Sequence, residues 1–424
     1  MKGQECARAV SACLVIGCAY ATHTERAHAD WEAVPDISLE AETNDNPAIN
    51  TVGSTDTQLI DSANRLLADV ILRIRKAEPR GEITFEPRVR TDKYAEEEAQ
   101  ILESTDWFLR SNGVQRGQTV QLGYSADLAQ ERLLGVEFLE TLPADPIADD
   151  PSAITTNTVG INEKRTRVGL APYVEIAMNS RSTVRIDGRL VDVDYANDTI
   201  PGRTDFLDRA IGGEYRRALR DQRGDFGVRL FASGYEATTN SNTTDVRGIE
   251  LFYSREMTEL LSWNISGGTQ RSDYALTSAG RRVRGTDDTP TFGLGINKRG
   301  ERSAMRTELL RRMTPDASGF VAPRDELRVS WTRKMSQRVN GRLAMRAIDA
   351  EGLPGVVGSA RRYGRMELGM DWALRPTWSF IASYAYSKAR SEDLTIGDAA
   401  DSNAIRIGVR YHGRSSTPGT FAQP

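Results

Sequence analysis

Few residues in this chain are of the types that carry acid–base, nucleophilic or metal chemistry. Hydrolysis by a Ser–His–Asp triad needs an imidazole, and a structural zinc site needs several cysteine or histidine ligands. The 424 residues include three cysteines and three histidines. All but His412 lie within the first 29 residues: Cys6, Cys13, Cys18, His23 and His28.

This leading segment has the features of a secretory signal. Lys2 and Arg8 supply positive charge, residues 9–21 are mostly apolar, and Ala27-His28-Ala29 is a small-residue cleavage site. Ala19-Tyr20-Ala21 is a second candidate cleavage site, and the segment 15–18 resembles a lipoprotein box. We expect residues 1–29 to be a signal peptide that is cleaved on export.

Without the leader, most hydrolytic and metal chemistries have no residues to perform them. A chain with no thiol forms no disulfide framework and no thiolate zinc site, and His412 would have to supply every imidazole. Carboxylates are abundant, but no spacing marks a glycosidase pair. The net charge of −4 disfavours nucleic acid as a partner. We therefore expect no enzyme activity, no cofactor and no bound metal.

The rest of the chain repeats one pattern, in which apolar residues occupy every second position. Clear examples are Ile405–Tyr411, Met366–Trp372 and Val184–Leu190, where the intervening positions are polar, charged or glycine. A period of two places all the apolar side chains on one face of a β-strand and the charged ones on the other. No apolar stretch beyond the leader is long enough for a transmembrane helix, and the mean hydropathy is −0.47.

This pattern predicts about eighteen strands, of which the segment 66–76 also fits a helical stripe. The expected strands are 34–44, 66–76, 82–92, 105–113, 118–128, 166–178, 182–195, 206–217, 224–236, 246–256, 260–270, 290–298, 303–313, 325–335, 339–349, 363–374, 377–388 and 403–412.

The expected connections alternate between short turns and long polar loops. The long loops are 45–65, 93–104, 129–165, 196–205, 237–245, 271–289, 314–324, 350–362 and 389–402. Tight turns on one side and longer loops on the other are typical of outer-membrane barrels, which close on themselves because hydrocarbon leaves no partner for an edge strand. We expect an all-β fold: a transmembrane, up-and-down antiparallel β-barrel over residues 30–413, followed by a disordered tail at 414–424. A soluble all-β fold is the alternative.

Two segments resemble known outer-membrane proteins. The segment Ile37–Pro47, with its Thr43-Asn44-Asp45-Asn46 corner, resembles the first strand of the β-barrel porin 2 family, and the succession of hairpins through Tyr411 resembles the same family. The resemblance implies a Gram-negative outer-membrane barrel, in a family of which some members are associated with exopolysaccharide export. The segment Arg406–Tyr411 also resembles the signal read by the barrel-assembly machinery, although Gly413 stands where a final aromatic residue is common.

The longest expected loop, 129–165, is the third on its side of the barrel. By analogy with diffusion porins, whose third loop narrows the lumen, its apolar-acidic segment would constrict the pore through Glu137, Phe138 and Glu140. The alternative is that the two flanking strands simply extend above the membrane.

The charged face of the strands supplies the candidate pore-lining residues: Arg185, Arg189, Arg229, Arg328, Arg342, Arg346, Glu367, Asp371, Arg406 and Arg410. The arginines would either form a basic ladder opposite Glu137 and Glu140 or pair with carboxylates on adjacent strands, among them Glu250, Glu308, Glu367 and Asp371. We favour the pairing, which would make the barrel wall rigid.

The combined expectation is a porin-like channel of the outer membrane for the passive passage of polar solutes, with a link to exopolysaccharide export. Expected partners are outer-membrane lipid and lipopolysaccharide, the barrel-assembly machinery and polysaccharide. Trp331, Trp372, Trp378 and Tyr411 would form an interfacial girdle. The alternative function is a plugged barrel that acts as a surface scaffold for assembly or adhesion.

Overall fold

The computed structural model places eighteen strands in one sheet that closes on itself. It describes residues 31–47, 62–136, 159–196, 204–238, 241–278, 281–316, 320–351, 361–391 and 400–413. Every strand is antiparallel to both of its neighbours, and the first strand pairs with the last, so the sheet has no free edge strand. The predicted fold class, an up-and-down antiparallel β-barrel of eighteen strands, is confirmed.

Neighbours in sequence are neighbours in the barrel throughout. The strands are β1 (Trp31–Asn44), β2 (Ala63–Glu78), β3 (Gly81–Tyr94), β4 (Ser104–Arg116), β5 (Val120–Val136), β6 (Val159–Asn179), β7 (Ser182–Tyr195), β8 (Phe206–Ala218), β9 (Gly224–Ala237), β10 (Thr243–Thr258), β11 (Leu261–Ser278), β12 (Arg281–Arg299), β13 (Ser303–Asp316), β14 (Phe320–Lys334), β15 (Val339–Ala350), β16 (Arg361–Arg375), β17 (Trp378–Ser391) and β18 (Ala400–His412). The segment with the alternative helical stripe is strand β2.

The strands sort their side chains as the period of two requires. One face carries exposed apolar residues on nearly every strand, for example Ile407 and Val409 on β18, Leu368 on β16 and Leu251 on β10, which is 63% exposed. The opposite face carries arginines and carboxylates joined in ion pairs. In a closed barrel the first of these faces is the outer surface and the second is the lumen.

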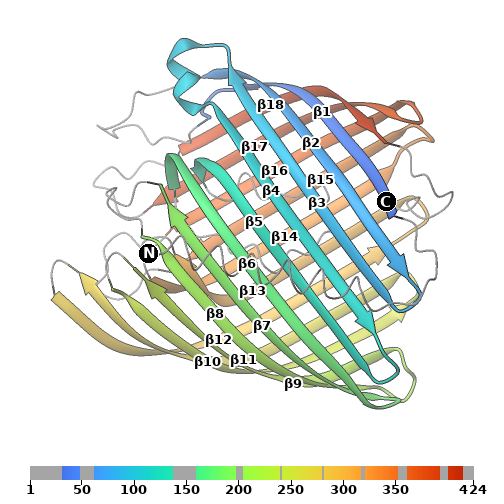
Figure 1. Cartoon of the computed structure of the whole chain (residues 1–424), viewed down its shortest axis with the longest axis vertical. Coiled ribbons are helices and arrows are strands. Elements are labelled where there is room, and N and C mark those ends of the chain that lie inside the picture. Colours follow the sequence, from blue (N-terminus) through green and yellow to red (C-terminus); the bar gives the residue numbers. More distant parts are fainter. Residues whose placement is uncertain are drawn as a thin grey trace.

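The barrel closes where its first and last strands meet, and Figure 1 shows blue β1 beside red β18. At one end of this seam, the Asp45 carboxylate accepts hydrogen bonds from the backbone and side-chain N–H groups of Asn403, at 2.6 and 2.8 Å. The Ser402 hydroxyl donates to Asn44 at 2.8 Å. The Asn44-Asp45 corner therefore ties the two ends of the sheet together, which is a structural reason for this motif.

Aromatic side chains gather at the end of the barrel with the short turns. The rings of Trp378 and Tyr411 lie 5.2 Å apart, and those of Tyr253 and Trp263 lie 5.4 Å apart. Trp372 and Trp378, on either side of the β16–β17 turn, are both nearly half exposed. Such a band of rings is typical of the interface between lipid hydrocarbon and water.

Three predicted loops are wrong in extent. The expected loop 314–324 is mostly strand, because β13 continues to Asp316 and β14 begins at Phe320. Most of the expected loop 271–289 is strand, because β11 and β12 pair as far as Ser278 and Arg281. The expected loop 129–165 is also shortened at both ends, because β5 continues to Val136 and β6 begins at Val159. All three segments extend a hairpin without apolar alternation, so backbone pairing alone marks them as strand.

A short 3₁₀ helix, η1 (Glu97–Leu102), lies in the connection from β3 to β4. Just before it, the backbone and side-chain N–H groups of Asn64 donate to the Glu96 carboxylate at 2.8 and 2.6 Å. These hydrogen bonds lower the pKa of Glu96 because they stabilise its ionised form. No helix within the described ranges is long and apolar enough to cross a membrane.

Candidate pore and its constriction

The ten predicted pore-lining residues all lie on the face opposite the exposed apolar rows. Arg185 and Arg189 on β7, for example, alternate with the outward-facing Ile186 and Leu190, and Arg406 alternates with Ile405 and Ile407. Whether these residues line a conducting pore is still a prediction, because their place on the strand fixes only the face.

Arginines and carboxylates pair across adjacent strands over much of this inner face. Arg189 binds Asp208 of the adjacent strand at 2.7 Å, and Arg342 likewise binds Glu367 at 3.3 Å. Arg229 of β9 reaches past β8 and binds Asp187 of β7 at 2.9 Å. Other pairs on the same face are Arg88–Asp69, Arg90–Asp106, Arg167–Asp127, Arg406–Glu42 and Arg410–Asp36. Cross-strand pairs of opposite charge stabilise a sheet, so the lumen arginines contribute to the wall itself.

The carboxylates that bind these arginines are mostly different from those predicted. Glu367 does bind lumen arginines, Arg342 and Arg365, and Glu308 binds Arg306 on its own strand. Within the described part of the chain, neither Glu250 nor Asp371 forms an ion pair. The remaining partners are aspartates and glutamates that the alternation pattern did not distinguish from other polar positions.

Glu326 on β14 is the centre of a dense charge cluster. Its carboxylate accepts from Arg328 at 2.6 Å and from Arg346 on β15 at 2.7 Å, and it also binds Arg324 at 2.5 Å. The Glu326 side chain is only 2% exposed. One carboxylate thus joins three guanidinium groups on two strands, deep on the inner face of the barrel.

On the long-loop side of this cluster, the hydrogen-bonded ladder between β12 and β13 ends early. Their ladder runs from Arg299 and Ala304 to Phe292 and Arg311 and ends there. The strand β12 continues to Arg281 paired only with β11, whereas β13 continues to Asp316 paired only with β14. The end of the β13–β14 hairpin, residues 312–316 and 320–323, is therefore detached from β12, and we refer to it as the hairpin tip.

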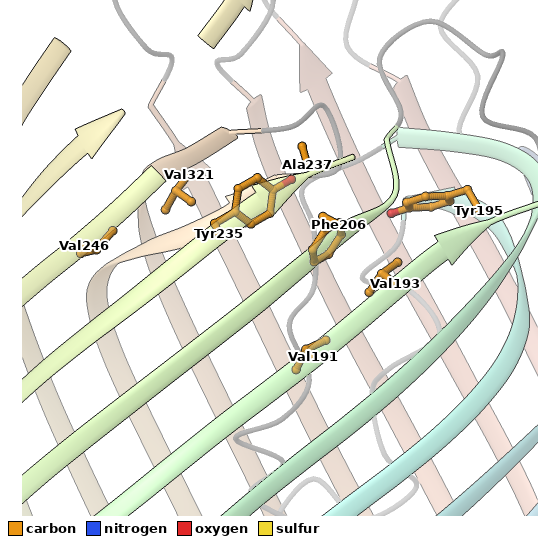
Figure 2. Close-up of a cluster of buried hydrophobic side chains, with 8 residues drawn as sticks. All are labelled: Val191, Val193, Tyr195, Phe206, Tyr235, Ala237, Val246 and Val321. Carbon is orange, nitrogen blue, oxygen red and sulfur yellow. The ribbon is translucent and has the colours of Figure 1, made fainter. Parts of the chain in front are cut away.

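The hairpin tip lies inside the barrel. Val321 and Met313 have the same alternation as the outward-facing Leu327 and Leu309, yet they pack in one cluster with lumen-facing residues of four other strands. Figure 2 shows Val321 beside Tyr235 and Val246, with Phe206 and Tyr195 farther along the same inner surface. The cluster members are Val191, Val193, Tyr195, Phe206, Tyr235, Ala237, Val246 and Val321.

These contacts bury apolar side chains that would otherwise face a wet lumen. Val191 and Val193 on β7 and Phe206 on β8 are at most 1% exposed, and Val321 is 5% exposed. On the other side of the tip, Ala322 packs with Leu276 and Tyr274 of β11. Because each fully buried side chain of this size contributes about 1.5–3 kcal/mol, the tip is held firmly against the wall from β7 to β11. It narrows the lumen there.

Prolines explain why the ladder ends. Continued in the same register, β12 and β13 would place Pro290 opposite Met313, which pairs on its other side with Pro323. Proline has no backbone N–H, so these positions cannot complete a ladder of hydrogen bonds. Pro290 at the start of the predicted strand 290–298, and Pro323 beside Val321 in the predicted loop 314–324, are the sequence signal for this constriction, which the strand pattern missed.

The predicted constriction is a different segment. Glu137, Phe138 and Glu140 lie outside the described residues, so the constriction of the pore by the loop between β5 and β6 stays a prediction.

His412, the one histidine beyond the leader, lies at the end of β18. One of its ring nitrogens forms a hydrogen bond with the Ser379 hydroxyl at 3.2 Å, and the other lies 3.1 Å from the Asp36 carboxylate. Within the ranges that the structure describes, no group of three or more histidine, cysteine or acidic residues is arranged to hold a metal ion.

Many solved structures are similar to this chain, among them the following three. OccK2 (OpdF) of Pseudomonas aeruginosa, in complex with glucuronate, is 12% identical with a TM-score of 0.45, over 92% of this chain and 99% of its own. OccAB3 of Acinetobacter baumannii is 11% identical with a TM-score of 0.43, over 90% and 99%. The ferric-catecholate import receptor Fiu of E. coli is 10% identical with a TM-score of 0.42, over 92% and 82%.

No protein-family model matches the sequence, and no curated protein matches it. The resemblance to the β-barrel porin 2 family is therefore not confirmed. The closed barrel of eighteen strands is established by the pairing of the strands alone.

Proposed function

We propose that the protein is a porin-like channel of the bacterial outer membrane that lets polar solutes pass passively. The observation that carries this proposal is a distribution of apolar and charged side chains that is the reverse of that in a soluble protein. Exposed Ile, Leu, Val, Phe and Trp side chains cover the outer face of the barrel, whereas ion pairs line its inner face. A barrel in lipid needs an apolar exterior and tolerates charge only where water reaches it.

Strand length supports the membrane placement. The strands have 12 to 21 residues, and tilted strands of about 9–11 residues are enough to cross a bilayer. Cleavage of residues 1–29 and recognition of β18 by the barrel-assembly machinery would bring the chain to this membrane. Lipopolysaccharide and outer-membrane lipid would then surround its apolar face.

A charge on the outer face tests the membrane placement. Leu251→Arg should destabilise the barrel in lipid vesicles by about 2–4 kcal/mol, because an arginine near the bilayer midplane loses its hydration. Leu260→Arg is the matched control, since Leu260 is 55% exposed in the short turn after β10 and would meet water. Urea unfolding of vesicle-inserted protein measures both variants, and equal stabilities would contradict the membrane placement.

Conduction tests the channel itself. Purified protein inserted into a planar bilayer should produce discrete, ohmic current steps, because its lumen is lined with charged groups and so holds water. Added oligosaccharide should interrupt these currents if the narrower role in exopolysaccharide export, implied by the family resemblance, applies. Complete absence of current steps in bilayers of several compositions would contradict the proposed channel.

A plugged barrel that serves as a surface scaffold is the second candidate. The observation that favours it is the hairpin tip, which fills part of the lumen and is packed there by apolar contacts. The two functions differ in one measurable respect. A scaffold stays closed unless the tip is dislodged, whereas a channel conducts with the tip in place.

A further inference from the structure

The two ring nitrogens of His412 face the two groups that a hydrolytic triad requires. Nε2 lies 3.2 Å from the Ser379 hydroxyl, and Nδ1 lies 3.1 Å from Oδ2 of Asp36. Such a triad needs only one imidazole, and it is recognised by the geometry of its three side chains and not by their order in the chain. The sequence disfavours this chemistry because histidine is scarce, but the structure places the remaining histidine where the chemistry needs it.

Closure of the barrel brings the three side chains together from the adjacent strands β17, β18 and β1. Asp36 is directly opposite His412 in the β1–β18 ladder, although 376 residues separate them in the chain. Ser379 lies diagonally across the β17–β18 ladder, within reach of a side chain as long as histidine. Ser379 and Asp36 alternate with the outward-facing Trp378 and Ile37, so the three side chains lie on the inner face, at the short-turn end of the barrel.

The partners of His412 determine the roles of its two nitrogens. An ionised carboxylate only accepts hydrogen bonds, so Nδ1 carries the proton and donates to Asp36. Nε2 is then the acceptor, and it faces the Ser379 O–H group. In this tautomer the imidazole can take the serine proton, while the carboxylate orients the ring and stabilises the imidazolium. Ser379 is 6% exposed and the His412 side chain 43%, so the hydroxyl is shielded from bulk water beside a ring that solutes in the lumen can reach.

Arg410 supplies positive charge beside the serine. It is directly opposite Ser379 in the β17–β18 ladder, on the same face, where paired residues have Cβ atoms about 4.5–5.5 Å apart. Its Nε atom lies 3.6 Å from Asp36 and, among the described residues, is buried without a hydrogen-bond partner. A guanidinium group next to the nucleophile would stabilise the negative oxygen that forms when a carbonyl group is attacked.

We propose that Ser379, His412 and Asp36 form a catalytic triad that hydrolyses carboxylic esters entering the lumen. Ser379 Oγ attacks the carbonyl carbon while His412 Nε2 takes the hydroxyl proton. The bond to the alcohol oxygen then breaks, the alcohol leaves with that proton, and the acyl group stays on Ser379. Water attacks the acyl carbon as His412 takes one of its protons. The bond to Oγ breaks, the carboxylic acid leaves, and the proton returns to Ser379.

The surroundings of the triad favour a short acyl group. Its apolar neighbours on the same face are Ile71, opposite Asp36, and Ile381, two residues after Ser379, and both are almost fully buried. These neighbours therefore offer little exposed apolar surface to a long acyl chain, whereas an acetyl group needs little. The expected substrate is a water-soluble ester of a short-chain acid. This activity goes beyond the proposed channel and does not depend on conduction.

Covalent labelling tests the nucleophile. A fluorophosphonate probe, which bonds to activated serine hydroxyls, should label the detergent-solubilised wild-type barrel, and mass spectrometry should place the adduct on Ser379. Ser379→Ala should lose the label. Ser383→Ala is the matched control and should keep it, because Ser383 lies on the same face of β17, four residues further along. An unlabelled wild type, or equal labelling of Ser379→Ala, would overturn the triad.

Hydrolysis of p-nitrophenyl acetate tests the three side chains as a unit. Asp36→Asn should lower kcat by roughly 10³–10⁴-fold and leave KM little changed, because an amide no longer holds the proton on Nδ1. His412→Gln should lower kcat by at least as much, since it removes the base. Heat-modifiable migration in SDS gels shows whether each variant is folded. Folded variants that hydrolyse the ester as fast as the wild type would contradict these roles.

Two further outcomes are decisive. The acyl preference predicts slower hydrolysis of p-nitrophenyl palmitate than of the acetate, and the reverse order would overturn the short-chain substrate. If the three side chains only tie β17, β18 and β1 together, the wild type hydrolyses neither ester and the variants unfold more easily, which would overturn the proposed activity. The assays need no current through the barrel, so either result leaves the channel proposal to its own test.

Discussion

Val321→Asp should raise the single-channel conductance roughly two- to fivefold, because the current through a pore is limited by its narrowest section. Val321 lies in the buried cluster with Tyr235 and Val246, where a carboxylate would have no cationic partner within the cluster. Burying an unpaired charge costs several kcal/mol, more than the burial of a valine contributes. The hairpin tip should therefore leave the inner wall and open the lumen.

One control variant and one measure of folding accompany this prediction. Val321→Ile retains an apolar side chain and should leave the conductance near the wild-type value. The heat-modifiable migration of folded barrels in SDS gels shows whether each variant is still closed. A folded Val321→Asp barrel with wild-type conductance would show that the tip is not the limiting constriction. A barrel that conducts only after this substitution would support the plugged scaffold.

The fold could be predicted because the membrane imposes a simple rule on every strand. Where hydrocarbon meets one face and water the other, strict alternation appears in the sequence, and the predicted strand 182–195 has the bounds of β7. Beyond the hydrocarbon this rule no longer applies. Residues 281–289 of β12 are therefore rich in Arg, Thr and Asp, and their strand character comes from pairing with β11.

The constriction could not be predicted from alternation because it depends on contacts between distant strands. Met313 and Val321 lie about a hundred residues from Val191 and Phe206 in the chain, and nothing in their local pattern says which surface they will cover. The face of a residue follows from its sequence position, whereas its partner follows from the closure of the barrel.

Glu326→Gln should lower the free energy of unfolding by about 3–5 kcal/mol, the cost of removing one partner from a buried ionic cluster. Glu326 accepts from Arg324, Arg328 and Arg346, and its side chain is almost fully buried. The neutral amide keeps the size of the side chain but removes the negative charge that offsets the mutual repulsion of these guanidinium groups. Urea unfolding of the detergent-solubilised barrel measures the change.

Glu351→Gln is the control for this effect of burial. Glu351 also binds an arginine, Arg311 at 2.7 Å, but half of its side chain is exposed. Exposed ion pairs contribute about 0–1 kcal/mol because water and salt screen them, so this variant should unfold close to the wild type. Similar losses in both variants would mean that the Glu326 cluster is hydrated in the folded barrel. In that case the hairpin tip would not exclude water from the inner face beneath it.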